Sequence, residues 1–137
     1  MIQIITGRAG SGKTKNLIEM ANTMVKVTDG HIVYVDADHS NLFNLSHNIR
    51  LVKTDDFPLD SNREFFGLVC GILSQDYDIK TIFIDGLLKN AKIDAARVDT
   101  LIKKFETVSE ANHVDFIISV CADADELPDS VKVYITE

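Results

Sequence analysis

The chain opens with MIQIITGRAGSGKTKNLIEMA at residues 1–21, and this stretch decides the fold. Residues 2–6 form a short apolar run rich in β-branched side chains, and residues 13–27 carry apolar side chains at helical spacing. Between them, residues 7–14 read GRAGSGKT, which matches the P-loop pattern GxxxxGK[ST]. Because the motif follows a strand and precedes a helix, we predict a strand, a phosphate-binding loop and a helix in that order.

The composition of this P-loop (residues 7–14) suits the binding of a polyphosphate. Its glycines let the backbone turn amide groups inward and approach phosphates closely, and the following helix presents its positive N-terminal end. Lys13 is expected to reach the β- and γ-phosphate oxygens, and the Thr14 hydroxyl to ligate Mg²⁺. The candidate nucleotide-binding residues are Gly7, Arg8, Ala9, Gly10, Ser11, Gly12, Lys13 and Thr14.

A magnesium site of this kind needs a carboxylate from another strand. Asp85 closes the apolar run IFID at residues 82–85, so we expect it at the carboxyl edge of the sheet, where ligands of open α/β folds bind. Asp85 is therefore the second candidate Mg²⁺ ligand beside Thr14. The alternative is an aspartate that caps a helix or a turn.

Hydrolysis also requires a group that activates water. Gly86, and not a glutamate, follows Asp85, so the commonest position for that base is empty. Asp38 lies just past the apolar run at residues 31–37 and is the candidate catalytic base, acting with Lys13. The alternative for Asp38 is a solvated acidic turn.

The rest of the chain alternates apolar runs with amphipathic segments. A capping box of Ser61 and Glu64 predicts the start of one helix, and residues 94–111 show a second helical pattern. Continuous apolar strands between amphipathic helices predict an α/β fold, with a mostly parallel sheet covered on both faces, as a single domain over residues 1–137. The expected strands are residues 2–6, 31–37, 49–52, 115–121 and 131–136, together with residues 80–88, where a buried strand ends in a turn.

Apolar runs, the first residues and the cysteines indicate the cellular compartment. No stretch approaches the roughly 20 apolar residues that cross a bilayer, and the start lacks the features of a signal peptide. Cys70 and Cys121 are isolated, so we expect two buried, reduced thiols and no disulfide. These features predict a cytoplasmic protein without a membrane partner.

Charge and histidine spacing bear on the partners. The net charge is −7, and acidic residues gather toward the C-terminus, so the charge does not favour nucleic-acid binding by this chain alone. None of the four histidines has the spacing of a metal motif, so we expect no histidine metal site. The remaining partners that we expect are a nucleotide and either a second copy of the chain or another protein.

The order of these motifs resembles the ATP-binding core of the RecA-like ATPases, which include the recombinases and the replicative DnaB-type helicases. The resemblance rests on the P-loop, on VYVDADHS at residues 33–40 and on TIFIDGLLK at residues 81–89. It implies a three-layer P-loop fold with strand order 3-2-4-5-1-6 and places Asp38 and Asp85 on adjacent strands. Asp38 stands where the recombinases have a catalytic glutamate, and the family's polar sensor falls near residues 119–121, where no glutamine occurs.

The resemblance implies a minimal core, because the sequence after residues 131–136 has no room for the DNA-binding loops of recombinases. We therefore expect an Mg²⁺–ATP-binding protein, and three functions remain open. The first is a slow RecA-like ATPase that acts through assembly or a partner. The others are an ATP-binding regulatory module without turnover and a small-molecule kinase.

Overall fold

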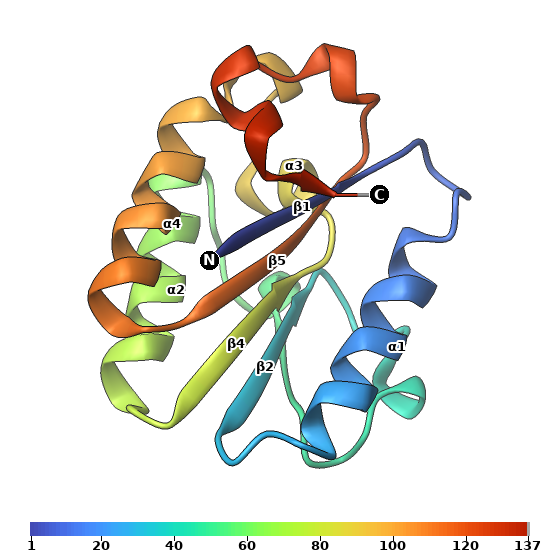
Figure 1. Cartoon of the computed structure of the whole chain (residues 1–137), viewed down its shortest axis with the longest axis vertical. Helices are drawn as coiled ribbons and strands as arrows, with labels where there is room; N and C mark the ends of the chain where they lie inside the picture. The colour runs from blue at the N-terminus through green and yellow to red at the C-terminus, as the bar shows by residue number, and fades with distance from the viewer. Residues whose placement is uncertain (137) are drawn as a thin grey trace.

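The computed structural model describes residues 1–136 and has an α/β architecture built on a six-stranded, all-parallel sheet. The strands follow the order β3-β2-β4-β5-β1-β6 (Figure 1). This order confirms the predicted fold class and the strand order implied by the resemblance. The strands are β1 (Ile2–Thr6), β2 (His31–Asp36), β3 (Arg50–Lys53), β4 (Ile79–Ile84), β5 (Asp115–Val120) and β6 (Ile135–Thr136).

Helices cover both faces of the sheet. One face packs against α1 (Lys13–Val25), and the other packs against α2 (Asn62–Gln75), α3 (Leu87–Ala91) and α4 (Asp99–Asn112) (Figure 1). Successive side chains of β4 alternate between the two cores: Ile82 and Ile84 pack with α2 to α4, and Phe83 packs with α1. Because both faces are buried, the middle of each central strand is a continuous apolar run, such as residues 32–35 of β2, 82–84 of β4 and 116–118 of β5.

The start of α2 confirms one half of the predicted capping box. The Glu64 amide donates to Ser61 Oγ at 3.2 Å, so Ser61 caps the helix. The return bond differs from the prediction, because the Glu64 carboxylate accepts from the Asp60 amide at 2.7 Å and not from Ser61. Together, the two hydrogen bonds still fix the backbone at the N-terminus of α2.

Two predicted strand segments also contain other elements in the structure. Residues 80–88 were expected to be a strand that ends in a turn, and β4 ends at Ile84 before a turn in which Gly86 has a φ of 86°, a left-handed backbone that favours glycine. Leu87 then begins α3 and is fully buried. In residues 131–136 only Ile135 and Thr136 pair with β1, because residues 129–134 form a 3₁₀ helix after Pro128.

The helix boundaries also differ in detail. The pattern at residues 13–27 predicts a helix two residues longer than α1, which ends at Val25. The pattern at residues 94–111 divides into a 3₁₀ turn at Ala95–Arg97 and the helix α4. These differences leave the layers of the fold unchanged.

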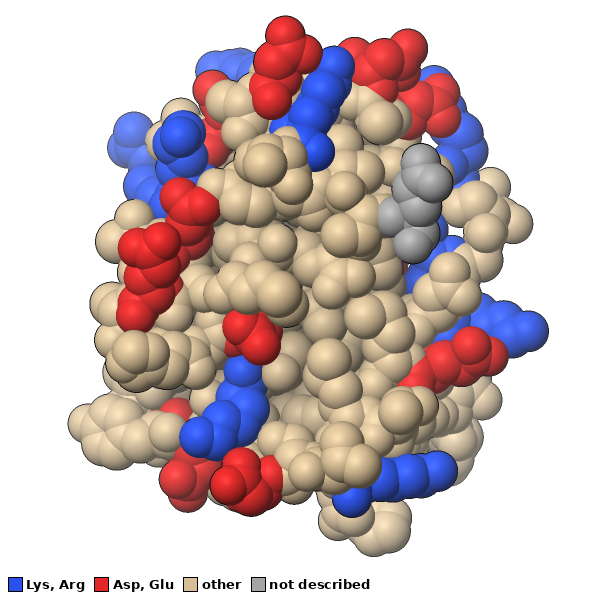
Figure 2. All heavy atoms as spheres, in the orientation of Figure 1, with Lys and Arg blue, Asp and Glu red and all other residues tan. Residues whose placement is uncertain are grey.

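The surface shows mixed charge, and both cysteines are free. Figure 2 shows the face with β1 in front, where Lys and Arg alternate with Asp and Glu around the rim. Cys70 is half-buried and Cys121 is exposed, so the thiols are free as predicted but Cys121 is not buried, because it lies just beyond the end of β5. Within residues 1–136, no helix has the length and apolar character needed to cross a bilayer.

Candidate functional site

The P-loop connects β1 to α1 and lies at the carboxyl edge of the sheet. Gly7 has a φ of 147°, and a Cβ there would come within 2.5 Å of Ser11 Oγ, so only glycine fits this position. Gly12 has a φ of 92° and precedes the first residue of α1. No side chain caps the N-terminus of α1, which leaves the positive end of the helix open to an anion.

Lys13 lies over the same loop. Its ammonium group donates to the carbonyl oxygens of Gly7 at 2.6 Å and Arg8 at 2.9 Å. It also lies 3.4 Å from Ser11 Oγ. The positive charge of Lys13 is therefore held at the P-loop. A phosphate oxygen can replace the two carbonyl oxygens as the acceptor of its hydrogen bonds.

Thr14 and Asp85 meet across the sheet edge, although 71 positions separate them in the sequence. The Thr14 hydroxyl donates to Asp85 Oδ1 at 3.2 Å. Asp85 follows the last residue of β4 and is 8 % exposed. The structure thus brings together the two residues that the sequence predicts as Mg²⁺ ligands.

Two further hydroxyl groups hold the Asp85 carboxylate. Tyr34, on the neighbouring strand β2, donates to Asp85 Oδ2 at 2.8 Å, and Ser119 on β5 donates to Oδ1 at 3.1 Å. Ser119 also accepts from the Gly86 amide at 2.8 Å. Burial and the nearby Asp85 charge strongly raise the pKa of Tyr34, so this phenol stays a donor.

Asn90 fixes the backbone at Asp85 and Gly86. Its side-chain amide donates to the carbonyl oxygens of Asp85 at 2.8 Å and Gly86 at 2.9 Å, and its Oδ1 accepts from Thr54 at 2.5 Å. Asn90, Thr54 and Tyr34 were not predicted as site residues, and Ser119 was expected only as part of the sensor region. No local sequence signal marks these contacts, because they depend on strand order and register.

The two acidic residues of the DADH segment have different surroundings. Asp36 is buried at the end of β2, and burial raises its pKa, while its oxygens accept from the Ala37 amide at 2.7 Å and Asn41 Nδ2 at 3.2 Å. Asp38 is exposed and accepts from the Ser40 amide at 2.9 Å. Bonding to Ser40 lowers the pKa of Asp38, with smaller contributions from the charges of Lys89 and His39. Asp38 is therefore an ionised carboxylate at the edge of the sheet.

Arg8 extends from the P-loop toward the segment after β5. Its guanidinium group pairs with Asp123 at 3.2 Å and with Glu126 at 2.9 Å. The bond to Asp123 and the charges of both carboxylates raise the pKa of Arg8. In this conformation the Arg8 side chain contacts acidic side chains, and the phosphate-binding side of the P-loop stays open.

The donors of this edge fit a magnesium nucleotide. A hydroxyl and a carboxylate oxygen lie within hydrogen-bond distance of each other, and Mg²⁺ prefers such hard oxygen ligands. The glycine cradle at Gly7 and the open helix end can accept phosphate groups through backbone amides. Thr14 and Asp85 are the residues that would hold the ion, and Lys13 lies beside the place for the phosphates.

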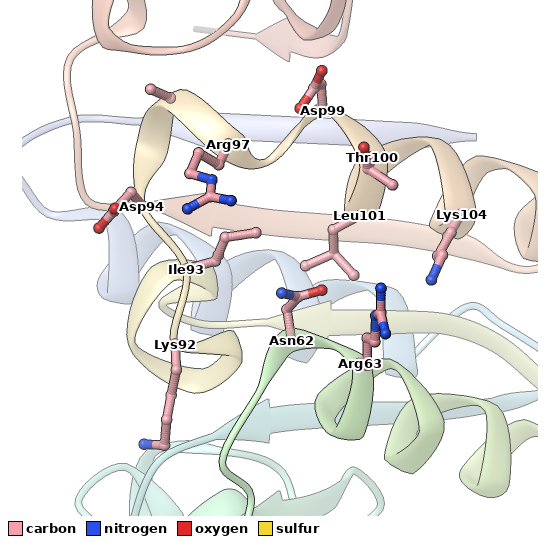
Figure 3. Close-up of a pocket in the computed structure, with 11 residues that line it drawn as sticks. Asn62, Arg63, Lys92, Ile93, Asp94, Arg97, Asp99, Thr100, Leu101 and Lys104 are labelled. Carbon is pink, nitrogen blue, oxygen red and sulfur yellow. The ribbon is translucent and has the colours of Figure 1, made fainter.

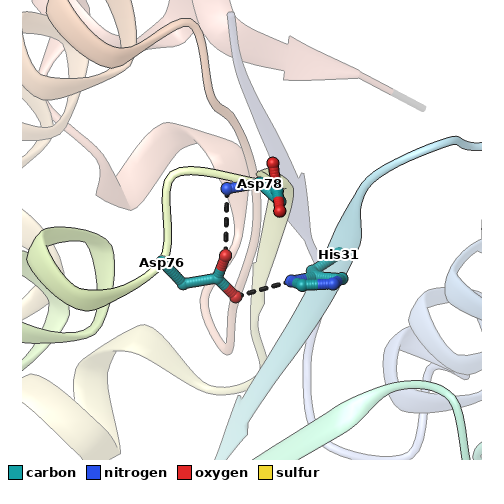
Figure 4. A group of neighbouring side chains, drawn as sticks. All are labelled: His31, Asp76 and Asp78. Carbon is teal, nitrogen blue, oxygen red and sulfur yellow. Dashed lines mark hydrogen bonds and ion pairs between the residues drawn. The ribbon is translucent and has the colours of Figure 1, made fainter.

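A second group of polar residues lies at the opposite, amino edge of the sheet (Figure 4). His31 Nδ1 lies 2.6 Å from Asp76 Oδ2, and the Asp78 amide donates to Asp76 Oδ1 at 2.9 Å. Bonding to Asp76 raises the pKa of His31, and the same contact lowers the pKa of Asp76. The three side chains have ligand atoms within 4.8 Å of one another, but these hydrogen bonds already account for their approach.

The sheet order and the loop at its edge define an α/β protein of the RecA-like fold. Among solved structures, the chain is similar to the flagellar accessory protein FlaH from Methanocaldococcus jannaschii, with a TM-score of 0.63 and 19 % sequence identity. The match covers 96 % of this chain and 65 % of that protein, so the chain spans less than two thirds of its length. At this identity the likeness shows the fold alone. No protein-family model and no curated protein match the sequence.

Proposed function

We propose that the protein binds Mg²⁺–ATP at the P-loop and hydrolyses it slowly, as a RecA-like ATPase that acts through assembly or a protein partner. One observation carries this proposal: the Thr14 hydroxyl lies 3.2 Å from the Asp85 carboxylate, beside an uncapped helix end and the Lys13 ammonium. A hydroxyl from the first turn of a helix and an acid from the end of a strand, meeting beside a phosphate cradle, are the parts that P-loop nucleotide sites use.

The roles of the residues follow from their chemistry. Bound Mg²⁺ would neutralise charge on the β- and γ-phosphates, held by Thr14 and Asp85. Lys13 would leave the carbonyl groups of the P-loop and pair with phosphate oxygens, because a charge-assisted bond to phosphate is stronger than one to a neutral carbonyl. Tyr34 and Ser119 orient the Asp85 carboxylate through their two donated hydrogen bonds.

Asp38 is the proposed base in hydrolysis. Its ionised carboxylate would accept a proton from water as the water oxygen bonds to the γ-phosphorus and the bond to the bridging oxygen of ADP breaks. Hydrogen bonding to Ser40 lowers the pKa of Asp38 and so makes it a weaker base, which supports a slow rate. The same observation favours the second candidate, an ATP-binding regulatory module without turnover.

Calorimetry and phosphate release test the proposal together. Wild-type protein should release heat on titration with Mg²⁺–ATP, and Lys13→Ala should weaken binding by about a hundredfold, since an anion loses its paired charge. Lys15→Ala is the matched control, because Lys15 is an exposed lysine on the same helix outside the P-loop. A folded wild-type sample that gives no heat would contradict nucleotide binding.

Turnover separates the two candidate functions. Asp38→Asn should abolish phosphate release while Mg²⁺–ATP binding persists, if Asp38 accepts the proton. Release that is unchanged in Asp38→Asn but lost in Asp36→Asn would assign the base to Asp36. Binding without release in the wild type would establish the regulatory module in place of the ATPase.

A further inference from the structure

A cavity of about 500 Å³ lies between the first turns of α2 and α4 and the segment that joins α3 to α4 (Figure 3). Neither the P-loop nor Asp85 lines it. Its size lies in the range of small-molecule sites, roughly 300 to 1,000 Å³. It is therefore large enough for a small organic ligand at a place separate from the nucleotide site.

The lining of this cavity has an excess of positive charge. Arg63, Lys92, Arg97 and Lys104 line it, against two carboxylates, Asp94 and Asp99. The whole chain carries a net charge of −7, so this local sign is opposite to that of the protein. An anion that approaches this face meets attraction that the overall charge does not provide.

None of these cations has an acidic partner in the part of the chain that the structure describes. Among residues 1–136, none of the four basic side chains of the cavity takes part in an ion pair. Arg8, by contrast, pairs with two carboxylates. The guanidinium groups of Arg63 and Arg97 thus keep their donor forks free, and such forks bind phosphate or carboxylate groups through paired hydrogen bonds.

The backbone adds to this positive field. The helices α2 and α4 each have 14 residues, and both begin at the cavity. No side chain caps the N-terminus of α4, so its first amide groups can donate to a ligand. Asn62 and Thr100 supply neutral polar groups in the same two first turns.

We infer that this cavity is a binding site for a small organic phosphate, with the Arg63 and Arg97 guanidinium groups, which lie on different sides of it (Figure 3), as its cationic donors. Asp94 and Asp99 would accept hydrogen bonds from a hydroxyl or amino group of the same molecule. These two carboxylates oppose a nucleic-acid backbone, whose successive phosphates would lie beside them. The inference does not depend on nucleotide binding at the P-loop.

Titration with glycerol 3-phosphate, followed by amide NMR without Mg²⁺ or nucleotide, tests the inference. The amides of Asn62, Arg63 and Thr100 should shift, and the double variant Arg63→Ala/Arg97→Ala should bind at least about tenfold more weakly, since two charge-assisted contacts are lost. Lys103→Ala is the matched control, because this exposed lysine is on α4 but does not line the cavity. It should change the affinity less than about twofold.

Several results would overturn the inference. These are shifts confined to residues 7–14, equal weakening in the control and the double variant, or tighter binding of citrate, a single-stranded oligonucleotide or a glutamate-rich peptide. Lys13→Ala should leave glycerol 3-phosphate binding at the cavity unchanged, and the double variant should retain its Mg²⁺–ATP heat. A failure of the cavity is therefore distinct from a failure of the proposed nucleotide site.

Discussion

The P-loop edge and the cationic cavity both offer positive charge to an anion, but they are built differently. At the P-loop edge, Asp85 is 8 % exposed and accepts hydrogen bonds from Thr14, Tyr34 and Ser119. The cavity relies on exposed basic side chains such as Arg63 and Arg97, which have no ion pair within residues 1–136. Buried hydrogen bonds fix the side chains at the P-loop edge. The basic side chains of the cavity have no such partners, so a ligand can orient them.

This difference predicts which substitutions should affect folding and which should affect only binding. Buried, fully bonded groups contribute to stability, and their loss leaves polar partners unsatisfied. Exposed, unpaired charges contribute little to stability but can contribute much to the affinity for an anion.

The largest effect is expected for Gly7→Val. A Cβ at this position would lie 2.5 Å from Ser11 Oγ, and valine does not tolerate a φ of 147°. Mg²⁺–ATP binding measured by calorimetry should fall by at least about a hundredfold, as the cradle is displaced. Gly67→Ala is the control, because no atom lies within 4 Å of a Cβ there. Equal affinity of Gly7→Val and wild type would contradict the account of the loop.

A large loss of stability is expected for Tyr34→Phe. The change removes a buried hydroxyl that donates to Asp85 at 2.8 Å, so the free energy of unfolding should fall by about 1.5–3 kcal/mol. Urea unfolding measures it, with Tyr77→Phe as the matched control, since Tyr77 is 94 % exposed. If both variants unfold at the same urea concentration as wild type, the carboxylate is not held as described.

Substitutions in the cavity, by contrast, should leave the free energy of unfolding almost unchanged. Arg63→Ala/Arg97→Ala should unfold within about 0.5 kcal/mol of wild type, because exposed cations without ion pairs stabilise the fold little. Urea unfolding in the same buffer provides the comparison. A loss comparable with that of Tyr34→Phe would show that these arginines are structural.

The smallest effect concerns His31 and Asp76. The raised pKa of His31 makes its contribution to stability complete below about pH 6.5 and lost as pH rises through the folded value. The lowered pKa of Asp76 makes its contribution present above about pH 3.9 and lost as pH falls through the folded value. Asp78 adds to the raised pKa of His31, and Arg50 adds to the lowered pKa of Asp76.

His31→Asn should therefore lower the melting temperature more near about pH 5 than near about pH 8.5. His47→Asn is the control, because His47 is exposed and has no ion pair among residues 1–136. Thermal unfolding across this pH range measures the difference. A uniform loss at all pH values would exclude the ionic contribution.

Local patterns predicted the parts of the site that depend on neighbours in sequence. The P-loop is eight consecutive residues, and Asp85 is marked by the apolar strand that it ends. The contacts of Asp85 with Tyr34 and Ser119 span 51 and 34 positions. They arise because β2, β4 and β5 are adjacent, which no short stretch of sequence encodes.

The errors in the fold have a similar cause. The prediction of a strand and a turn over residues 80–88 includes Leu87, which is the first residue of α3 and is buried in the core through that helix. The alternating pattern of residues 131–136 also fits a 3₁₀ segment that buries Val131. Burial explains an apolar residue in either backbone conformation, so apolarity alone did not distinguish them.

Paramagnetic broadening by Mn²⁺ in the presence of ATP tests the central claim most directly, because it reports where a divalent ion binds. We expect Mn²⁺–ATP to broaden the amide signals of Thr14, Asp85 and Gly86 at substoichiometric ion, and we expect Asp85→Asn to remove the effect. Broadening confined to His31, Asp76 and Asp78, or unchanged when ATP is omitted, would contradict the assignment of Thr14 and Asp85 as the ligands of a nucleotide-bound ion.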